Sequence, residues 1–89
     1  MTADLLADAS EHLRRAADAA EGDEADRFDR EADALATAAA DDSGVDHGWL
    51  AKHTHTIRDA AGGASDEARG HAEAAVECIN EYREDVPGV

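Results

Sequence analysis

The spacing of the apolar residues is the feature that most limits what this chain can fold into. In four segments they recur at alternating steps of three and four residues, which places them on one face of an α-helix. The four stripes are Leu6, Ala9, Leu13, Ala16 and Ala20; Ala25, Phe28, Ala32, Leu35 and Ala39; Leu50, His53, Ile57 and Ala60; and Ala68, Ala72, Ala75, Ile79, Tyr82 and Val86. A disordered acidic chain would not carry four such stripes, so the pattern predicts an all-α protein.

Capping residues and glycines set the approximate ends of the four predicted helices. The residues expected to cap their N-termini are Thr2, Asp23, Asp46 and Ser65. The breaks are expected near Gly22, Gly44 and the pair Gly62 and Gly63. The predicted helices therefore span about 3–21, 24–40, 47–61 and 66–85, with short connections that make successive helices antiparallel. The sequence predicts a single domain over residues 1–89, an up-down-up-down four-helix bundle.

The predicted core is thin. The chain has 89 residues, and alanine makes up most of the 43% of residues that are hydrophobic. Alanine brings helices close together but buries little apolar area per residue. A second arrangement therefore stays open, in which two helical hairpins complete their core only in a dimer, and we expect either a monomer or a homodimer.

The charge of the chain indicates its solvent. The sequence holds 22 acidic and 8 basic residues, giving a formal net charge of −14, and Lys52 is its single lysine. Such a surface suits a protein in multimolar salt, where the Debye length falls to about 3 Å at 1 M and self-repulsion is screened. The same charge argues against nucleic-acid binding, which depends on neutralising phosphates. An acidic protein that mimics nucleic acid is a further, less favoured interpretation.

The cellular location is predicted from two features. Cys78 is the single cysteine and cannot form an intramolecular disulfide. The sequence also shows neither a secretory leader nor an apolar run long enough to cross a bilayer. We expect a cytoplasmic protein with no membrane association.

The segment "DHGWLAKHTHTIRDAAGG", residues 46–63, contains three of the five histidines and the single tryptophan. His53 and His55 point roughly 200° apart around a helix and cannot share a metal ion. His53 lies on the apolar stripe, so we expect it to be largely buried and replaceable by leucine with little loss of stability. Trp49, His53 and Tyr82 form the candidate interaction or ligand face.

No pattern in the sequence indicates catalysis or a resident cofactor. The chain lacks a nucleophile-and-base arrangement, a phosphate-binding glycine loop and a metal-binding motif, so we expect no enzyme, no cofactor and no metal site. The favoured hypothesis is a non-enzymatic interaction module, adapted to high salt, with an unidentified protein partner. The alternative is a bundle that binds a small ligand or metal through His53 and the neighbouring Trp49.

Two stretches, "DHGWLAKHTHTIRDAA" and "AVECINEYREDVPGV", together with the alanine-rich helices and capping aspartates, resemble a family of short haloarchaeal proteins of unknown function. The resemblance covers essentially the whole chain. It implies a halophilic cytoplasm and a small helical fold, and it assigns no catalytic residue.

Overall fold

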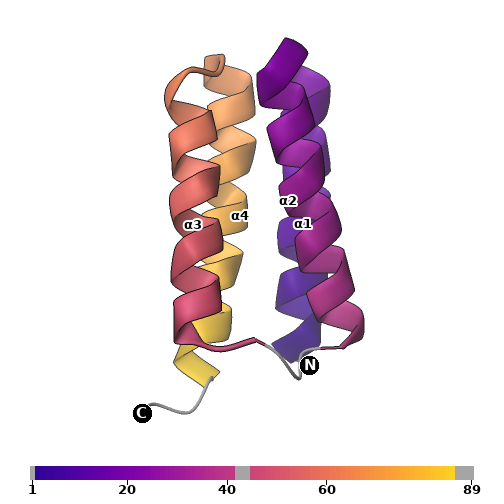
Figure 1. Cartoon of the computed structure of the whole chain (residues 1–89), viewed down its shortest axis with the longest axis vertical. Helices are drawn as coiled ribbons and strands as arrows, with labels where there is room; N and C mark the ends of the chain where they lie inside the picture. The colour runs from indigo at the N-terminus through magenta and orange to yellow at the C-terminus, as the bar shows by residue number, and fades with distance from the viewer. Residues whose placement is uncertain (1, 42–44, 86–89) are drawn as a thin grey trace.

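The computed structural model describes residues 2–41 and 45–85, with the side chains of 2, 3 and 85 excepted. Its helices are α1 (Thr2–Ala19), α2 (Gly22–Ala40), α3 (His47–Gly62) and α4 (Asp66–Asp85), and these residues contain no strand. Neighbouring helices alternate in direction and lie side by side in a bundle of 36 × 21 × 17 Å (Figure 1). The predicted all-α four-helix bundle is confirmed.

The predicted stripes form the core. The largest fully buried side chains are Leu6, Leu13, Phe28, Leu35, Leu50, Ile57 and Ile79. Alanines fill the space between them, among them Ala9, Ala16, Ala32, Ala68, Ala72 and Ala75. Ala20, Ala25 and Ala39 are half-buried at the edges of the core, and Val86 lies outside the described residues.

The helix ends agree with the predicted caps at two positions. Asp46 caps α3, since its Oδ1 accepts a hydrogen bond from the Trp49 backbone N–H at 2.8 Å. Ser65 precedes α4, and its Oγ accepts a hydrogen bond from the backbone N–H of Ala68 at 3.2 Å. Both side chains satisfy N–H groups that have no partner within the helix.

The start of α2 differs from the prediction. Its N-cap is Glu21, whose side chain makes no capping hydrogen bond, and Asp23 lies in the first turn instead. The difference arises because Gly22 adopts φ +62°, which is accessible to glycine and reverses the chain before Asp23. The predicted cap Thr2 is instead the first residue of α1. The break predicted near Gly44 lies outside the described residues.

The four helices do not pack equally well. α1 makes extensive contacts with both α2 and α4, whereas α3 makes far fewer contacts with either of its neighbours. The α1–α2 interface is tightened by the buried Ser10 hydroxyl, which donates to the Ala32 carbonyl at 2.7 Å. The looser packing of α3 leaves a groove along each of its sides, and both grooves are candidate sites. None of the described helices is long and apolar enough to cross a membrane.

Candidate functional site

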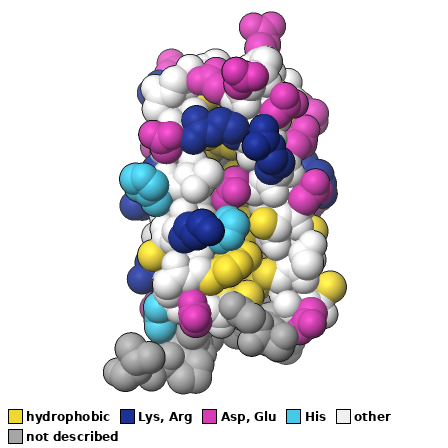
Figure 2. Space-filling model, in the orientation of Figure 1, with side chains coloured by type: hydrophobic (Ala, Val, Ile, Leu, Met, Phe, Trp, Pro, Cys, Tyr) yellow, Lys and Arg dark blue, Asp and Glu magenta, His cyan; other side chains and the backbone are white. Residues whose placement is uncertain are grey.

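The first candidate site is a groove of about 390 Å³ between α2 and α3, here called the α2–α3 groove. Its lining residues are Asp33, Ala34, Thr37, Ala38 and Asp41 from α2 and its C-terminal end, with Val45, Trp49 and His53 from α3 and the residues before it. Figure 2 shows hydrophobic side chains gathered on this face, over the seam between the two helices. The groove therefore offers an accessible apolar surface on a protein whose exterior is otherwise mostly charged.

His53 closes one end of the groove through a hydrogen bond to Glu31. The His53 Nδ1 and Glu31 Oε1 atoms are 2.7 Å apart, and the two side chains are 17% and 12% exposed. The indole of Trp49 lies against the imidazole, with ring centroids 4.1 Å apart and an interplanar angle of 42°. Glu31 and Trp49 together fix the orientation of His53, and His53 in turn fixes Trp49.

A second polar contact joins α2 and α3 further toward the α3–α4 turn. Arg27, one helical turn before Glu31, donates a hydrogen bond from Nη2 to Asp59 Oδ2 at 2.7 Å. This hydrogen bond, supported by the guanidinium charge, lowers the pKa of Asp59. Polar pairs thus close one half of the α2–α3 interface, while the other half stays open as the groove.

The structure brings together two of the three residues that the sequence predicts for an interaction or ligand face. Trp49 is half-buried and lines the groove, and His53 lies at its closed end. Tyr82 does not belong to this face: it is 4% exposed, packs in the core on α4 and does not line the groove. Tyr82 ends up inside because it continues the α4 stripe, one turn after Ile79.

Glu31 is the residue that the sequence analysis missed. Backbone and side chain together, Glu31 is 9% exposed, although glutamate is rarely buried without a partner. Its position carries a signal, because it lies three residues after Phe28 and four before Leu35, on the inward face of α2. A carboxylate in that register requires a hydrogen-bond donor from a neighbouring helix, and the imidazole Nδ1 of His53 is the group that meets it.

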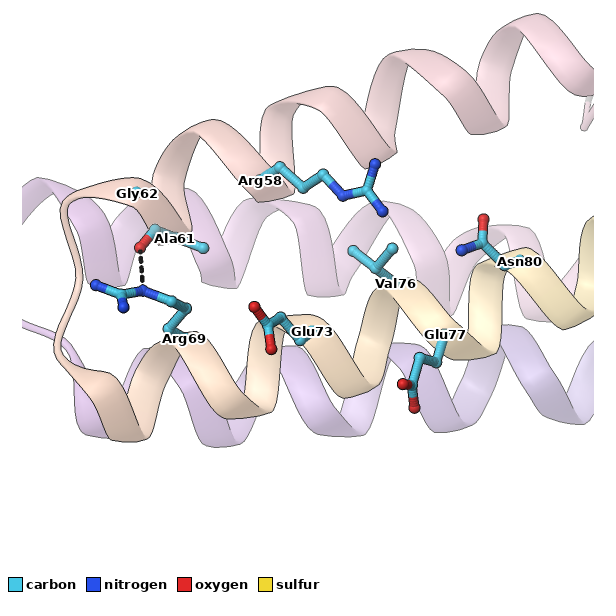
Figure 3. Close-up of a pocket in the computed structure, with 8 residues that line it drawn as sticks. All are labelled: Arg58, Ala61, Gly62, Arg69, Glu73, Val76, Glu77 and Asn80. Atoms are coloured by element: carbon cyan, nitrogen blue, oxygen red, sulfur yellow. Dashed lines mark hydrogen bonds between the residues drawn. The ribbon is translucent and has the colours of Figure 1, made fainter.

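The second candidate site is a groove of about 510 Å³ between α3 and α4, here called the α3–α4 groove (Figure 3). Its lining residues are Arg58, Ala61 and Gly62 from α3 with Arg69, Glu73, Val76, Glu77 and Asn80 from α4. Arg69 supports the turn, donating from Nε to the Ala61 carbonyl at 3.5 Å and from Nη2 to the Ala64 carbonyl at 3.4 Å. Arg58 extends along the groove toward Val76 and Asn80 in Figure 3 and makes no hydrogen bond or ion pair with the described residues. This groove is walled by charges of both signs.

The single cysteine, Cys78, lines neither groove. Cys78 is half-buried, and burial raises the pKa of its thiol, with a further contribution from the carboxylates of Asp8, Glu81 and Glu77. Across residues 2–41 and 45–85, no three His, Cys, Asp or Glu side chains come close enough together to hold a metal ion.

Comparison with known proteins assigns the chain to a family. It matches the family of unknown function DUF7553 over residues 1–85, and it belongs to this family. No curated protein and no solved structure matches the chain.

Proposed function

We propose that this member of the DUF7553 family is a non-enzymatic interaction module that binds a protein partner through the α2–α3 groove and is adapted to high salt. The observation that carries the proposal is Trp49, half-buried on an open apolar groove instead of in the core. Tryptophan is enriched among the residues that dominate protein–protein binding, and an aromatic side chain beside a pocket is a common anchor.

Trp49 is also held in place before any partner arrives. Its backbone N–H is bound by the Asp46 cap, and its ring lies against His53, which Glu31 fixes. A side chain already ordered in the free protein loses less conformational entropy on binding, and this favours affinity. The α3–α4 groove offers no equivalent anchor, because its largest apolar residue, Val76, is 4% exposed.

The same contacts weigh against the alternative of a small-ligand or metal site at His53. The imidazole already uses Nδ1 for Glu31 and one ring face for Trp49. Nε2 is the only ring nitrogen of His53 left to bind a metal ion, and no three His, Cys, Asp or Glu side chains among the described residues come close enough together to complete such a site. The groove is better suited to receive apolar side chains than to coordinate an ion.

The high-salt part of the proposal rests on charge. The net charge of −14 covers a small bundle, and exposed carboxylates such as Asp18 and Asp26 make no ion pair within the described residues. We place the protein in the cytoplasm, where a lone half-buried thiol such as Cys78 stays reduced.

Thermal unfolding followed by circular dichroism tests the salt adaptation. The midpoint should rise steadily from low salt to molar KCl, because repulsion is weakly screened in dilute buffer and strongly screened in molar salt. The variant Asp18→Asn/Asp26→Asn carries two fewer negative charges, so it should reach a given thermal midpoint at a lower KCl concentration than the wild type. A midpoint that stays flat or falls as KCl is added would contradict the adaptation and favour a nucleic-acid mimic.

Cross-linking and affinity capture in molar KCl test the binding function. The wild-type chain should capture a specific protein that the Trp49→Ala variant does not. Leu5→Ala is the matched control, since Leu5 is also a half-buried apolar residue but lies on α1, outside the lining of the groove. A partner captured equally well by Trp49→Ala, or no specific partner for any variant, would refute the proposed function.

A further inference from the structure

We infer that the α2–α3 groove receives an amphipathic helix of a different protein, one that carries lysine or arginine residues beside its apolar stripe. This inference rests on the proposed function and adds the chemistry of the partner to it. The shape of the groove and the charge of its wall support it independently of each other.

The groove follows the helix axes. On one side Ala34 and Ala38 are separated by one turn, and on the other Trp49 and His53 are separated by one turn. From Asp33 to Asp41 the α2 wall is about 12 Å long, at 1.5 Å per residue. A helix presents apolar side chains at steps of three and four residues, so three successive side chains, which span about 10.5 Å from the first to the third, match this length.

The volume sets how the helix binds. A space of about 390 Å³ accommodates a few side chains but not the backbone of a helix with its surrounding atoms. The partner helix therefore lies along the outside of the seam and inserts its apolar side chains against Trp49, Val45 and Ala38. This is the mode in which an amphipathic helix binds a hydrophobic groove.

The wall of the groove is acidic. Asp33 and Asp41 line its α2 side and are both exposed, and the described lining contains no lysine or arginine. Arg14 donates to Oδ1 of Asp33 at 2.9 Å, and a carboxylate with a second oxygen can accept another donor. A basic residue of the partner is attracted to this wall, and an acidic one is repelled.

The same charge disfavours a second copy of this chain as the occupant. A symmetric dimer through this groove would place the acidic wall of one protomer near the same wall of the other, and each protomer carries a net charge of −14. The α3–α4 groove differs, because Arg58 and Arg69 lie there beside Glu73 and Glu77. Selection for a basic partner is thus a property of the α2–α3 groove.

Peptide binding to the full chain tests the inference, with Trp49 as the fluorescent reporter because it is the single tryptophan. The probes are three tryptophan-free helical peptides of equal length. The first has a leucine stripe flanked by lysines, the second has the same stripe flanked by glutamates, and the third has the lysine composition with its leucines scattered around the helix. Affinities are measured in dilute buffer and in molar KCl.

The lysine-flanked stripe should bind with one-to-one stoichiometry and shift the emission of Trp49. In dilute buffer it should bind at least about tenfold more tightly than the glutamate-flanked stripe, and this preference should shrink in molar KCl because salt screens the wall. Its advantage over the scattered peptide should persist in molar KCl. Ala34→Gln, which fills the groove, should weaken binding about tenfold, while Ala51→Gln, exposed on α3 outside the groove, should not.

Four results would overturn the inference. Equal affinity for the lysine and glutamate peptides would remove the charge preference. Equal affinity for the striped and scattered peptides, or an unchanged affinity in Ala34→Gln, would show general attraction to an acidic protein. Sedimentation that finds a dimer abolished by Ala34→Gln would assign the groove to a second copy. If any of these results occurs while capture of a partner still depends on Trp49, the inference fails and the proposed function stands. If capture does not depend on Trp49 either, the proposed function is refuted as well.

Discussion

Replacing His53 with leucine should destabilise the protein, and the reason is Glu31. From its place on the apolar stripe alone, His53→Leu was expected to be nearly neutral. The structure changes this expectation, because the substitution would leave the mostly buried Glu31 carboxyl group without its hydrogen-bond partner at 2.7 Å. Removing one partner of a fully buried ion pair costs about 3–5 kcal/mol. The side chains here are 17% and 12% exposed, so water can reach the remaining carboxyl group, and we expect a loss of about 2–3 kcal/mol.

That loss is large for this molecule. A domain of this size has roughly 5 kcal/mol of stability, and 2–3 kcal/mol corresponds to a midpoint lower by roughly 10–20 °C. Urea denaturation in molar KCl, followed by helical circular dichroism, measures the free energy of unfolding at constant screening. His55→Leu is the matched control, since His55 is exposed on the same helix and should change stability by less than about 0.5 kcal/mol. The double variant Glu31→Leu/His53→Leu should recover most of the loss, because an apolar pair leaves no buried polar group. If His53→Leu is as stable as His55→Leu, the Glu31–His53 contact does not contribute as argued.

Three further predictions concern single groups. Asp46→Ala should lower stability by about 1 kcal/mol in the same urea assay, since it removes the cap that binds the Trp49 N–H, and Asp46→Asn should retain most of it. Arg27→Gln should raise the pKa of Asp59, because the hydrogen bond from the guanidinium lowers it in the wild type, and NMR titration measures this change. Any stability that the contact contributes is present at neutral pH and is lost as the pH falls through the folded-state pKa of Asp59. Iodoacetamide should alkylate Cys78 more slowly in the folded chain than in urea at neutral pH, because burial and nearby carboxylates raise the pKa of the thiol. For the same reason, the alkylation rate of the folded chain should keep rising to a higher pH than that of the unfolded chain.

Residues near one another in sequence made the fold predictable. The stripes on residues 6–20, 25–39 and 68–82 identified the inward faces, since helical periodicity depends on spacing alone. The Asp46 and Ser65 caps were predictable for the same reason: each acts on an N–H group three residues later. Asp23 failed as a cap because the left-handed conformation of Gly22 moved the helix start, and a composition rule does not specify φ.

The candidate site was harder to predict because it depends on contacts between helices. Sequence spacing placed Trp49 and His53 on α3 but could not show that α3 packs loosely against both neighbours. The partner of His53 lies 22 residues away, on α2, and no local pattern pairs the two. Tyr82 was assigned to the candidate face, although its own stripe on α4, where it follows Ile79 by three residues, predicts the burial that the structure shows.

Stability and binding should be separable at the contact between Glu31 and His53. The double variant Glu31→Leu/His53→Leu is expected to keep its fold, but it removes the imidazole against which Trp49 lies at 4.1 Å. Trp49 then samples more orientations in the free protein, and ordering it on binding costs more, by about 0.5–1.5 kcal/mol for an immobilised side chain. Affinity for the lysine-flanked peptide should therefore fall roughly three- to tenfold in the double variant, although its urea midpoint is near that of the wild type. Titration of both proteins in molar KCl measures this difference. Equal affinities would mean that His53 serves the stability of the α2–α3 interface alone and that Trp49 needs no support from it to bind.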